Sequence, residues 1–189
     1  MLVGLGNPGL RYRRTRHNVG FMVASELLRR ARCGPDRMQN EALVAPIRIR
    51  DAEVLVVQPQ AFMNLSGASV AGVARRRGME ASEILMVYDD ADLPLGAIRV
   101  RAEGSPAGHR GVMSIVEAMG TREIPRVRLG IGKDAGELAE RVLAPFTRAE
   151  LPLVELMIHD AADAVEVAIL RGITAAANAY NRRAVPAQE

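Results

Sequence analysis

Residues 2–31 read LVGLGNPGLRYRRTRHNVGFMVASELLRRA, and this stretch decides the fold. Its start, residues 2–6, is a short apolar run that ends in glycines, which is typical of a buried β-strand. After Asn18 the period changes, because the apolar residues recur at helical spacing. Asn18 is a suitable N-cap, and Gly34 with Pro35 is a suitable stop. The sequence therefore predicts a strand, a loop and a helix in that order.

The same alternation continues along the chain. Strand-like runs lie at residues 43–48, 54–58, 84–88, 98–101 and 127–131, and helical patterns lie at 65–77, between the 103–111 loop and Gly120, and over most of the chain after Gly136. A tight turn at Asp51 joins the first two of these strands, so the sheet is mixed rather than purely parallel. We predict one α/β domain over residues 1–183, a twisted mixed β-sheet covered by helices on both faces, and a loose C-terminal tail at 184–189.

The composition is that of an ordinary globular protein. Of the 189 residues, 49% are hydrophobic and 25% are charged, while only 3% are aromatic, so aliphatic side chains must fill the core. The single cysteine, Cys33, excludes an internal disulfide and a multi-cysteine metal site. The N-terminus lacks the pattern of a secretory signal, and no apolar run approaches the ~20 residues that a membrane span needs. We therefore expect a monomeric, cytoplasmic protein without a membrane partner.

The cationic residues are strongly biased toward arginine. The formal net charge is +3, and Lys133 is the only lysine. The arginines cluster within residues 11–16 and 75–77, and Arg99 and Arg101 alternate on one predicted strand. Genome composition alone can produce such a bias. The clustering favours a polyanionic partner, because guanidinium groups bind phosphates well and release counterions when they do so.

Gly4, Gly6 and Gly9 spell G-x-G-x-x-G, the fingerprint of dinucleotide-binding domains. That fingerprint needs a helix that begins within the loop, and an acidic residue about 20 positions further on at the end of a second strand. Here no apolar helical stripe begins before Val19, and Glu26 lies in the middle of the predicted helix. The motif fails its structural context, so no nucleotide cofactor is expected.

Three histidines are candidates for acid–base chemistry, because imidazole titrates near neutral pH, at about 6.5. His159 lies in a helical run and is expected to be a satisfied surface residue. His109 lies in the 103–111 loop, where a binding role and a structural role both remain open. His17 lies between a strand-end loop and a helix start, which suits a catalytic base or a structural loop residue. A base needs a partner that fixes its tautomer, and Asp89, at a predicted strand end, is the natural candidate.

Other chemistries find less support in the sequence. The acidic run 89–92 suits turn and cap residues, and it lacks the spacing of a calcium-binding loop. Ser66 has no G-x-S-x-G context and is better explained as a helix cap. We predict no metal and no cofactor. The remaining chemistry is direct attack by water on an activated carbonyl, which Asn7 and Asn64 could polarise with their amide groups.

At these same residues the sequence closely resembles the bacterial peptidyl-tRNA hydrolase family. The matching motifs are VGLGNPG at 3–9, Tyr12, TRHNVG at 15–20, FMNLSG at 62–67, YDDADLPLG at 88–96, GSPAGHRG at 104–111 and RVRLGIG at 126–132. They keep the family's order and spacing from Val3 to Gly132. The single α/β domain that the resemblance implies agrees with the one predicted from the strand and helix pattern.

The resemblance implies hydrolysis of the ester that joins a peptide to the 3′ ribose of tRNA, without metal or cofactor. By motif match, His17 would activate the water and Asp89 would orient it, while Asn7 and Asn64 would hold the reacting carbonyl. The residues that would bind the substrate are Tyr12, Phe62, Met63, Asn64, His109 and Arg110, and those that would grip tRNA phosphate are Arg101 and Arg128. The expected partner is therefore peptidyl-tRNA, which such phosphate contacts position without reading its sequence.

One position departs from the family pattern. The loop normally reads Gly-His-Asn-Gly, and here Arg110 replaces the asparagine that contacts the peptide backbone. Arginine has five donors and no acceptor, so it can grip a carbonyl but cannot accept a hydrogen bond from an amide N–H. Arg110 and the arginine clusters also motivate an alternative, a non-catalytic RNA-binding relative similar to organellar intron-splicing factors. The retention of His17 and Asp89 favours the enzyme, because a pure binder has no need of a base and its orienting partner.

Overall fold

The computed structural model describes residues 1–34, 37–133 and 137–181, and within them the chain forms one seven-stranded sheet. The strands are β1 (Leu2–Gly4), β2 (Arg37–Gln39), β3 (Ala42–Ile49), β4 (Ala52–Pro59), β5 (Leu85–Asp90), β6 (Ile98–Arg101) and β7 (Arg126–Gly130). Their order across the sheet is β2-β3-β4-β1-β5-β7-β6. The central strands β4, β1, β5 and β7 are parallel, and β2, β3 and β6 add antiparallel pairings at the two sides. The predicted mixed sheet is confirmed.

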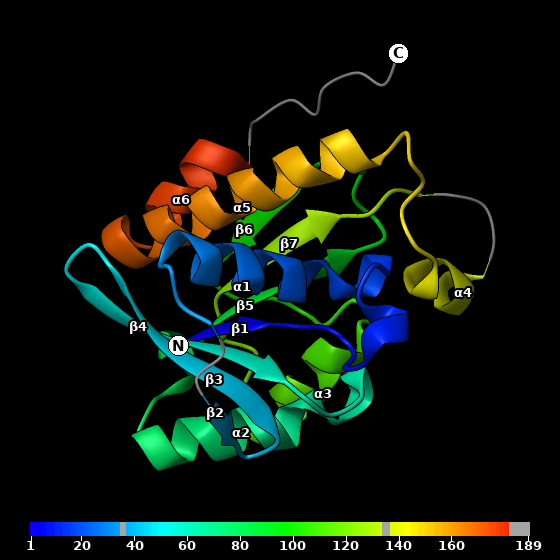
Figure 1. The fold of residues 1–189 in the computed structure, drawn as a ribbon. Helices are drawn as coiled ribbons and strands as arrows, with labels where there is room; N and C mark the ends of the chain where they lie inside the picture. The colour runs from blue at the N-terminus through cyan, green and yellow to red at the C-terminus, as the bar shows by residue number, and fades with distance from the viewer. Residues whose placement is uncertain (35–36, 134–136, 182–189) are drawn as a thin grey trace.

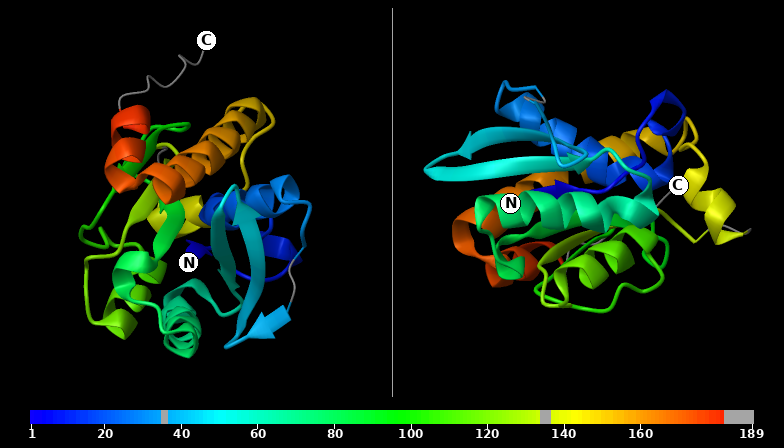
Figure 2. Two further views of the ribbon diagram at one scale, coloured as in Figure 1. Left: turned by 90° about the vertical axis from the view of Figure 1, so that its left-hand side faces the viewer. Right: turned by 90° about the horizontal axis from the view of Figure 1, so that it is seen from below.

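Helices cover both faces of this sheet, as predicted (Figures 1 and 2). They are α1 (Val19–Arg30), α2 (Ser66–Arg77), α3 (Arg110–Met119), α4 (Leu138–Leu143), α5 (Leu151–Arg171) and α6 (Ile173–Tyr180). One hydrophobic core joins α1, α5 and α6 to one face of the sheet, and a second joins α2 and α3 to the other. None of the described helices has both the length and the hydrophobicity needed to cross a membrane.

The glycines of the apparent dinucleotide fingerprint have a packing role. A Cβ atom on Gly4 would lie 2.4 Å from the carbonyl oxygen of Gly20, and one on Gly6 would lie 2.6 Å from the ring of Phe21. These glycines let β1 approach α1 closely. The segment after Gly9 forms a short 3₁₀ turn, and α1 begins only at Val19, so the loop has no helix N-terminus for a pyrophosphate.

The predicted C-terminal ends of two helices are confirmed at glycines. Gly78 and Gly120 end α2 and α3 in the left-handed conformation, with φ of 63° and 72°. Of two predicted caps, the position of Asn18 is confirmed and that of Ser66 was wrong. Asn18 occupies the N-cap position of α1, but its side chain bonds to Asn7 rather than to the helix. Ser66 is the first residue of α2, and its hydroxyl donates to the carbonyl of Met63.

Two further predictions concern the margins of the chain. The short edge strand β2 has no counterpart among the predicted strands, because its three residues are too few to show an alternating pattern. The predicted boundary at residue 183 and the tail at 184–189 lie outside the described residues.

Candidate active site

The carboxyl ends of β1 and β5 meet at one edge of the sheet, and the predicted catalytic residues gather there. Asn7 follows β1 and Asp89 lies near the end of β5, while short 3₁₀ turns carry His17 (turn Arg16–Asn18) and Asn64 (turn Met63–Leu65). A cavity of about 650 Å³ opens at this edge. It is lined by all four of these residues, together with Phe62, Met63, Tyr88, His109, Arg110, Arg128 and one side of α4. The sequence placed these residues together correctly.

His17 and Asp89 form the central polar contact of the cavity. The Nδ1 atom of His17 lies 2.7 Å from Oδ1 of Asp89, and the two side chains are 11% and 2% exposed. An ionised carboxylate only accepts hydrogen bonds, so Nδ1 of His17 carries the proton and Nε2 keeps its lone pair. No described residue hydrogen-bonds to that Nε2 atom. The arrangement is therefore that of an oriented general base.

Asp89 is held in its ionised form. Burial alone would raise the pKa of this carboxyl, but the electrostatic interaction with His109 and the hydrogen bonds from His109 and His17 outweigh it and hold the pKa well below its ordinary value. Asp89 can therefore orient an imidazole and stabilise an imidazolium without taking up the proton itself.

His109 is a second histidine at the same carboxylate. It is the N-cap of α3, where its Nδ1 accepts from the backbone N–H of Val112 at 3.2 Å. This bond fixes the proton on Nε2, which donates to Oδ1 of Asp89 at 3.0 Å. Its ring also lies 4.9 Å from the rings of His17 and Tyr88. Sequence reasoning left the role of His109 open; the structure places it in the polar centre of the site.

Asn7 is fixed by hydrogen bonds on three sides. Its backbone N–H donates to the side chain of Asn18 and its carbonyl accepts from that side chain, both at 2.9 Å. Its own Oδ1 accepts from the backbone N–H of Met63 at 2.9 Å. The amide NH₂ of Asn7 is left for the cavity that Asn7 lines. Asn64 is exposed and lines the same cavity, so two residues with amide side chains line it together with His17.

The predicted substrate-binding residues divide into two groups. Phe62, Met63 and Arg110 line the cavity; Phe62 and Arg110 are exposed and Met63 is buried. Tyr12 is not among the lining residues. Its ring lies under the guanidinium of Arg11, which also donates to the Tyr12 hydroxyl. Its contact with substrate stays a prediction.

The two predicted phosphate contacts lie in different places. Arg128 lines the cavity and donates to Asp90, so part of its guanidinium is already engaged. Arg101 is exposed at the end of edge strand β6, opposite Arg126 in the register and away from the strand ends that carry the site. A ligand that touched both arginines would have to extend along the β7–β6 side of the sheet.

His17, Asp89 and His109 could bring ligand atoms within 4.8 Å of one another, the one such metal-like group among the described residues. Nδ1 of His17, Nε2 of His109 and Oδ1 of Asp89 already form the two histidine–carboxylate hydrogen bonds. A metal ion would have to displace both bonds, so the geometry fits acid–base chemistry better than chelation.

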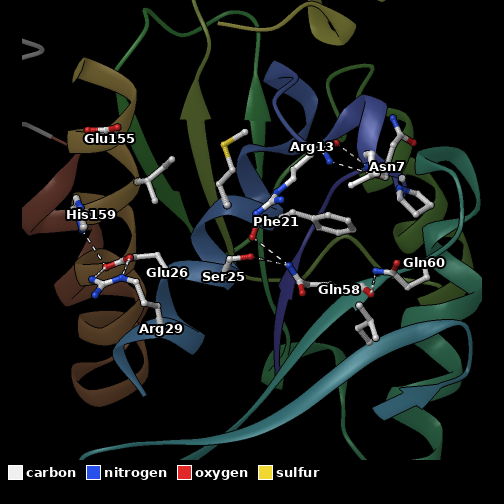
Figure 3. A pocket seen from close by; sticks show the side chains of 17 residues that line it. Asn7, Arg13, Phe21, Ser25, Glu26, Arg29, Gln58, Gln60, Glu155 and His159 are labelled. Carbon is white, nitrogen blue, oxygen red and sulfur yellow. Dashed lines mark hydrogen bonds and ion pairs between the residues drawn. The ribbon is translucent and has the colours of Figure 1, made fainter. Parts of the chain in front are cut away.

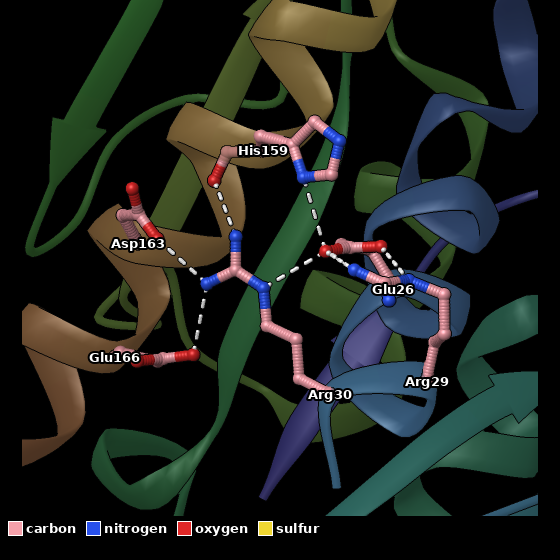
Figure 4. A network of polar contacts seen from close by, with 6 residues as sticks. All are labelled: Glu26, Arg29, Arg30, His159, Asp163 and Glu166. Atoms are coloured by element: carbon pink, nitrogen blue, oxygen red, sulfur yellow. Dashed lines mark hydrogen bonds and ion pairs between the residues drawn. The ribbon is translucent and has the colours of Figure 1, made fainter. Parts of the chain in front are cut away.

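A larger cavity of about 940 Å³ lies on the other side of Asn7, between α1, β4 and α5 (Figure 3). Sequence reasoning did not find it. Its side chains mostly bond to one another: Gln58 donates to Ser25, and the carboxylate of Glu26 accepts from Arg29 and His159 (Figure 4). His159 is thus a satisfied, half-exposed residue, as predicted.

The sheet order and the His17–Asp89 pair beside a cavity lined by two side-chain amides fit the class of α/β hydrolases. A family model described as peptidyl-tRNA hydrolase matches residues 1–188. The chain belongs to the peptidyl-tRNA hydrolase family, a family of ester hydrolases.

Relatives and solved structures agree with this membership. A peptidyl-tRNA hydrolase of Syntrophomonas wolfei is 46% identical over 96% of this chain and 99% of its own length. One from Carboxydothermus hydrogenoformans is 43% identical, with coverage of 96% and 98%. A crystal structure of a peptidyl-tRNA hydrolase complex with N-propanol superposes with a TM-score of 0.92 at 28% identity, covering 98% of this chain and 95% of that one. The enzyme from Acinetobacter baumannii gives 0.90 at 28% identity, covering 96% and 93%.

Proposed function

We propose that this protein hydrolyses the ester between peptide and tRNA in peptidyl-tRNA, and so recycles tRNA from aborted translation. His17 is the general base and Asp89 orients it. The observation that supports this most directly is the 2.7 Å bond from Nδ1 of His17 to Asp89, because it leaves Nε2 as a proton acceptor facing the cavity.

The reaction needs only water and the side chains of this site. The water oxygen attacks the ester carbonyl while Nε2 of His17 takes the water proton. The amide groups of Asn7 and Asn64 stabilise the negative charge that develops on the carbonyl oxygen. The imidazolium, supported by Asp89, then gives its proton to the departing 3′ oxygen of the ribose. The products are a peptide acid and intact tRNA.

The remaining predicted contacts position the two arms of the substrate. Phe62, Met63, His109 and Arg110 lie on the cavity walls and bind the peptide side or the terminal adenosine, and Tyr12 is proposed for the same role. Arg101 and Arg128 hold tRNA phosphate, which suits the arginine-rich surface. We also propose that the protein acts as a monomer in the cytoplasm without a metal ion.

The test is acyl release from N-acetyl-aminoacyl-tRNA in the presence of EDTA. The wild type should be active, and His17→Ala should lose at least about 10³-fold in kcat because the base is gone. His159→Ala is the matched control, since this histidine is half-exposed and outside the site, and it should keep full activity. A wild type that binds tRNA but releases no acyl group would instead support the non-catalytic RNA-binding alternative.

A further inference from the structure

We propose that Arg126 is a positioning residue that holds His109 against Asp89, and thereby sets the pH range over which His17 works as a base. This inference rests on the proposed function of His17. Arg126 is the first residue of β7 and is 1% exposed, the largest side chain among the most deeply buried residues of the described chain. It is not among the residues that line the cavity beside His17.

A buried guanidinium is costly unless its donors are satisfied. No described carboxylate forms an ion pair with Arg126; its partners are backbone carbonyls instead. Nε donates to Ile124 at 3.0 Å, Nη2 to Arg122 at 2.9 Å and Nη1 to Ser105 at 3.3 Å. An apolar side chain would fill this core position without that desolvation cost, so the arginine is best explained by what it holds in place.

One of those carbonyls belongs to the loop that carries His109. Ser105 lies four positions before His109, in a loop that turns through left-handed Ala107 (φ 47°) and Gly108 (φ 79°). Left-handed backbone at a non-glycine residue is unfavourable and persists only where surrounding contacts enforce it. The bond from Arg126 anchors this loop to β7, which is itself paired on both sides in the sheet.

A second route from Arg126 to His109 passes through Tyr88. The Tyr88 ring packs edge-on against the His109 ring at 4.9 Å. Burial raises the pKa of the Tyr88 hydroxyl, and the positive charge of Arg126 opposes that rise. Arg126 therefore supports His109 through its loop, and its charge also acts on the aromatic ring that packs against His109.

The position of His109 matters to the base because both histidines use one oxygen of Asp89. A bond from His109 withdraws part of the carboxylate charge from His17. If His109 moves away, the full charge of Asp89 acts on His17 and favours its protonated form. The other charged groups that line the cavity are Asp90, Asp92, Arg110, Arg128, Glu137 and Arg141, and they remain unchanged when Arg126 is replaced.

The experiment measures kcat/KM against pH for wild type, Arg126→Lys and Arg126→Met, with N-acetyl-aminoacyl-tRNA as substrate. The acidic limb should move to higher pH by about half a unit in both variants, since a lysine cannot reach three carbonyls. His109→Ala should give the same shift, and Arg126→Lys combined with His109→Ala should shift no further than either alone. Arg99→Met, on the neighbouring strand, is the matched control and should keep the wild-type profile.

Several outcomes separate this inference from the alternatives. A purely structural role predicts a lower melting temperature with an unchanged pH profile, and that result would overturn the proposal. If Arg126→Met does not fold, Arg126→Lys and Tyr88→Phe provide the same measurement with smaller changes in volume. An active His17→Ala enzyme would refute the proposed function itself; an inactive one, together with unshifted Arg126 variants, would refute only this inference.

Discussion

His17 and His109 donate to the same oxygen of Asp89, at 2.7 and 3.0 Å, from rings whose centroids are 4.9 Å apart and tilted by 52°. The two donors come from segments on either side of Asp89 in the chain, a 3₁₀ turn before α1 and the N-cap of α3. One buried carboxylate thus fixes the tautomer of both histidines. Because Nδ1 of His109 already accepts from a backbone N–H, His17 is the one of these two histidines that keeps a ring nitrogen without a partner among the described residues.

Asp89→Asn should lower kcat by about 10²–10⁴-fold with a small effect on KM. The asparagine oxygen can still accept from both histidines but carries no full negative charge, so it stabilises the His17 imidazolium less. If the amide turns over, its NH₂ group faces the histidines and favours the wrong tautomer of His17. Steady-state kinetics on N-acetyl-aminoacyl-tRNA measure the effect. Asp92→Asn, an exposed residue in the same segment, is the control and should change kcat less than about twofold. Equal losses in the two variants would contradict the role given to Asp89.

Arg110→Asn should lower KM severalfold and leave kcat nearly unchanged. The guanidinium of Arg110 lies on the exposed rim of the cavity and offers only donors, whereas asparagine can also accept from a peptide N–H. The expected change is about 1 kcal/mol of binding, or roughly fivefold in KM. Arg171→Asn, exposed at the end of α5, controls for the lost positive charge. A fall in kcat with unchanged KM would mean that Arg110 acts on the chemical step instead.

Arg101→Ala should weaken the salt dependence of KM. If tRNA is held largely through phosphates, KM for the wild type rises steeply with salt, and removal of one contact lowers the slope of log KM against log salt concentration by about one. Arg48→Ala is a matched control, because Arg48 is also an exposed strand arginine and is engaged by Glu53. A KM that does not respond to salt in the wild type would rule out the phosphate role of Arg101.

The sequence predicted those features that depend on local pattern. Gly78 and Gly120 end their helices as predicted because a left-handed residue after a helical run favours glycine, and that preference is local. The position of Asp89 could be predicted because residues at the carboxyl ends of neighbouring parallel strands lie at the same edge of the sheet. Asn64 was offered as an amide that could polarise a carbonyl, and the resemblance to a family then gave the same residue a role, while its exposed place on a short turn is visible only in the structure.

The features that sequence reasoning missed depend on contacts between distant segments. The local sequence of Asn18 predicts a side chain that caps the helix. The loop after β1 brings Asn7 within reach, and the side chain of Asn18 forms two hydrogen bonds with the backbone of Asn7 instead. Arg126 received no role of its own from the sequence, because a strand pattern does not reveal which backbone carbonyls surround a buried side chain. The sequence placed Glu26 in the middle of a helix, but it could not show that His159 of α5 lies beside it.

Glu26→Gln should reduce stability at neutral pH and have less effect in acid. Glu26 is buried on α1 and accepts from Arg29, Arg30 and His159, which link α1 to α5 together with Asp163 and Glu166 (Figure 4). The hydrogen bond from Arg29, opposed by burial and helped by Arg30, lowers the pKa of this carboxyl from 4.5 to about 2. A folded-state pKa below the unfolded value stabilises the protein above about pH 4.5, and this contribution is lost as the pH falls toward 2.

Thermal or urea unfolding of wild type and Glu26→Gln at pH 7 and at pH 3 checks this prediction. Solvent screening of the partly exposed arginines reduces the expected difference at pH 7 to about 1–2 kcal/mol. That corresponds to a few degrees in melting temperature for a chain of this size, and the gap should narrow at pH 3. Glu53→Gln is the control, because its bond to Arg48 is highly exposed and should contribute little at either pH. A difference that is the same at both pH values would mean that Glu26 stabilises the α1–α5 contact by packing rather than by its charge.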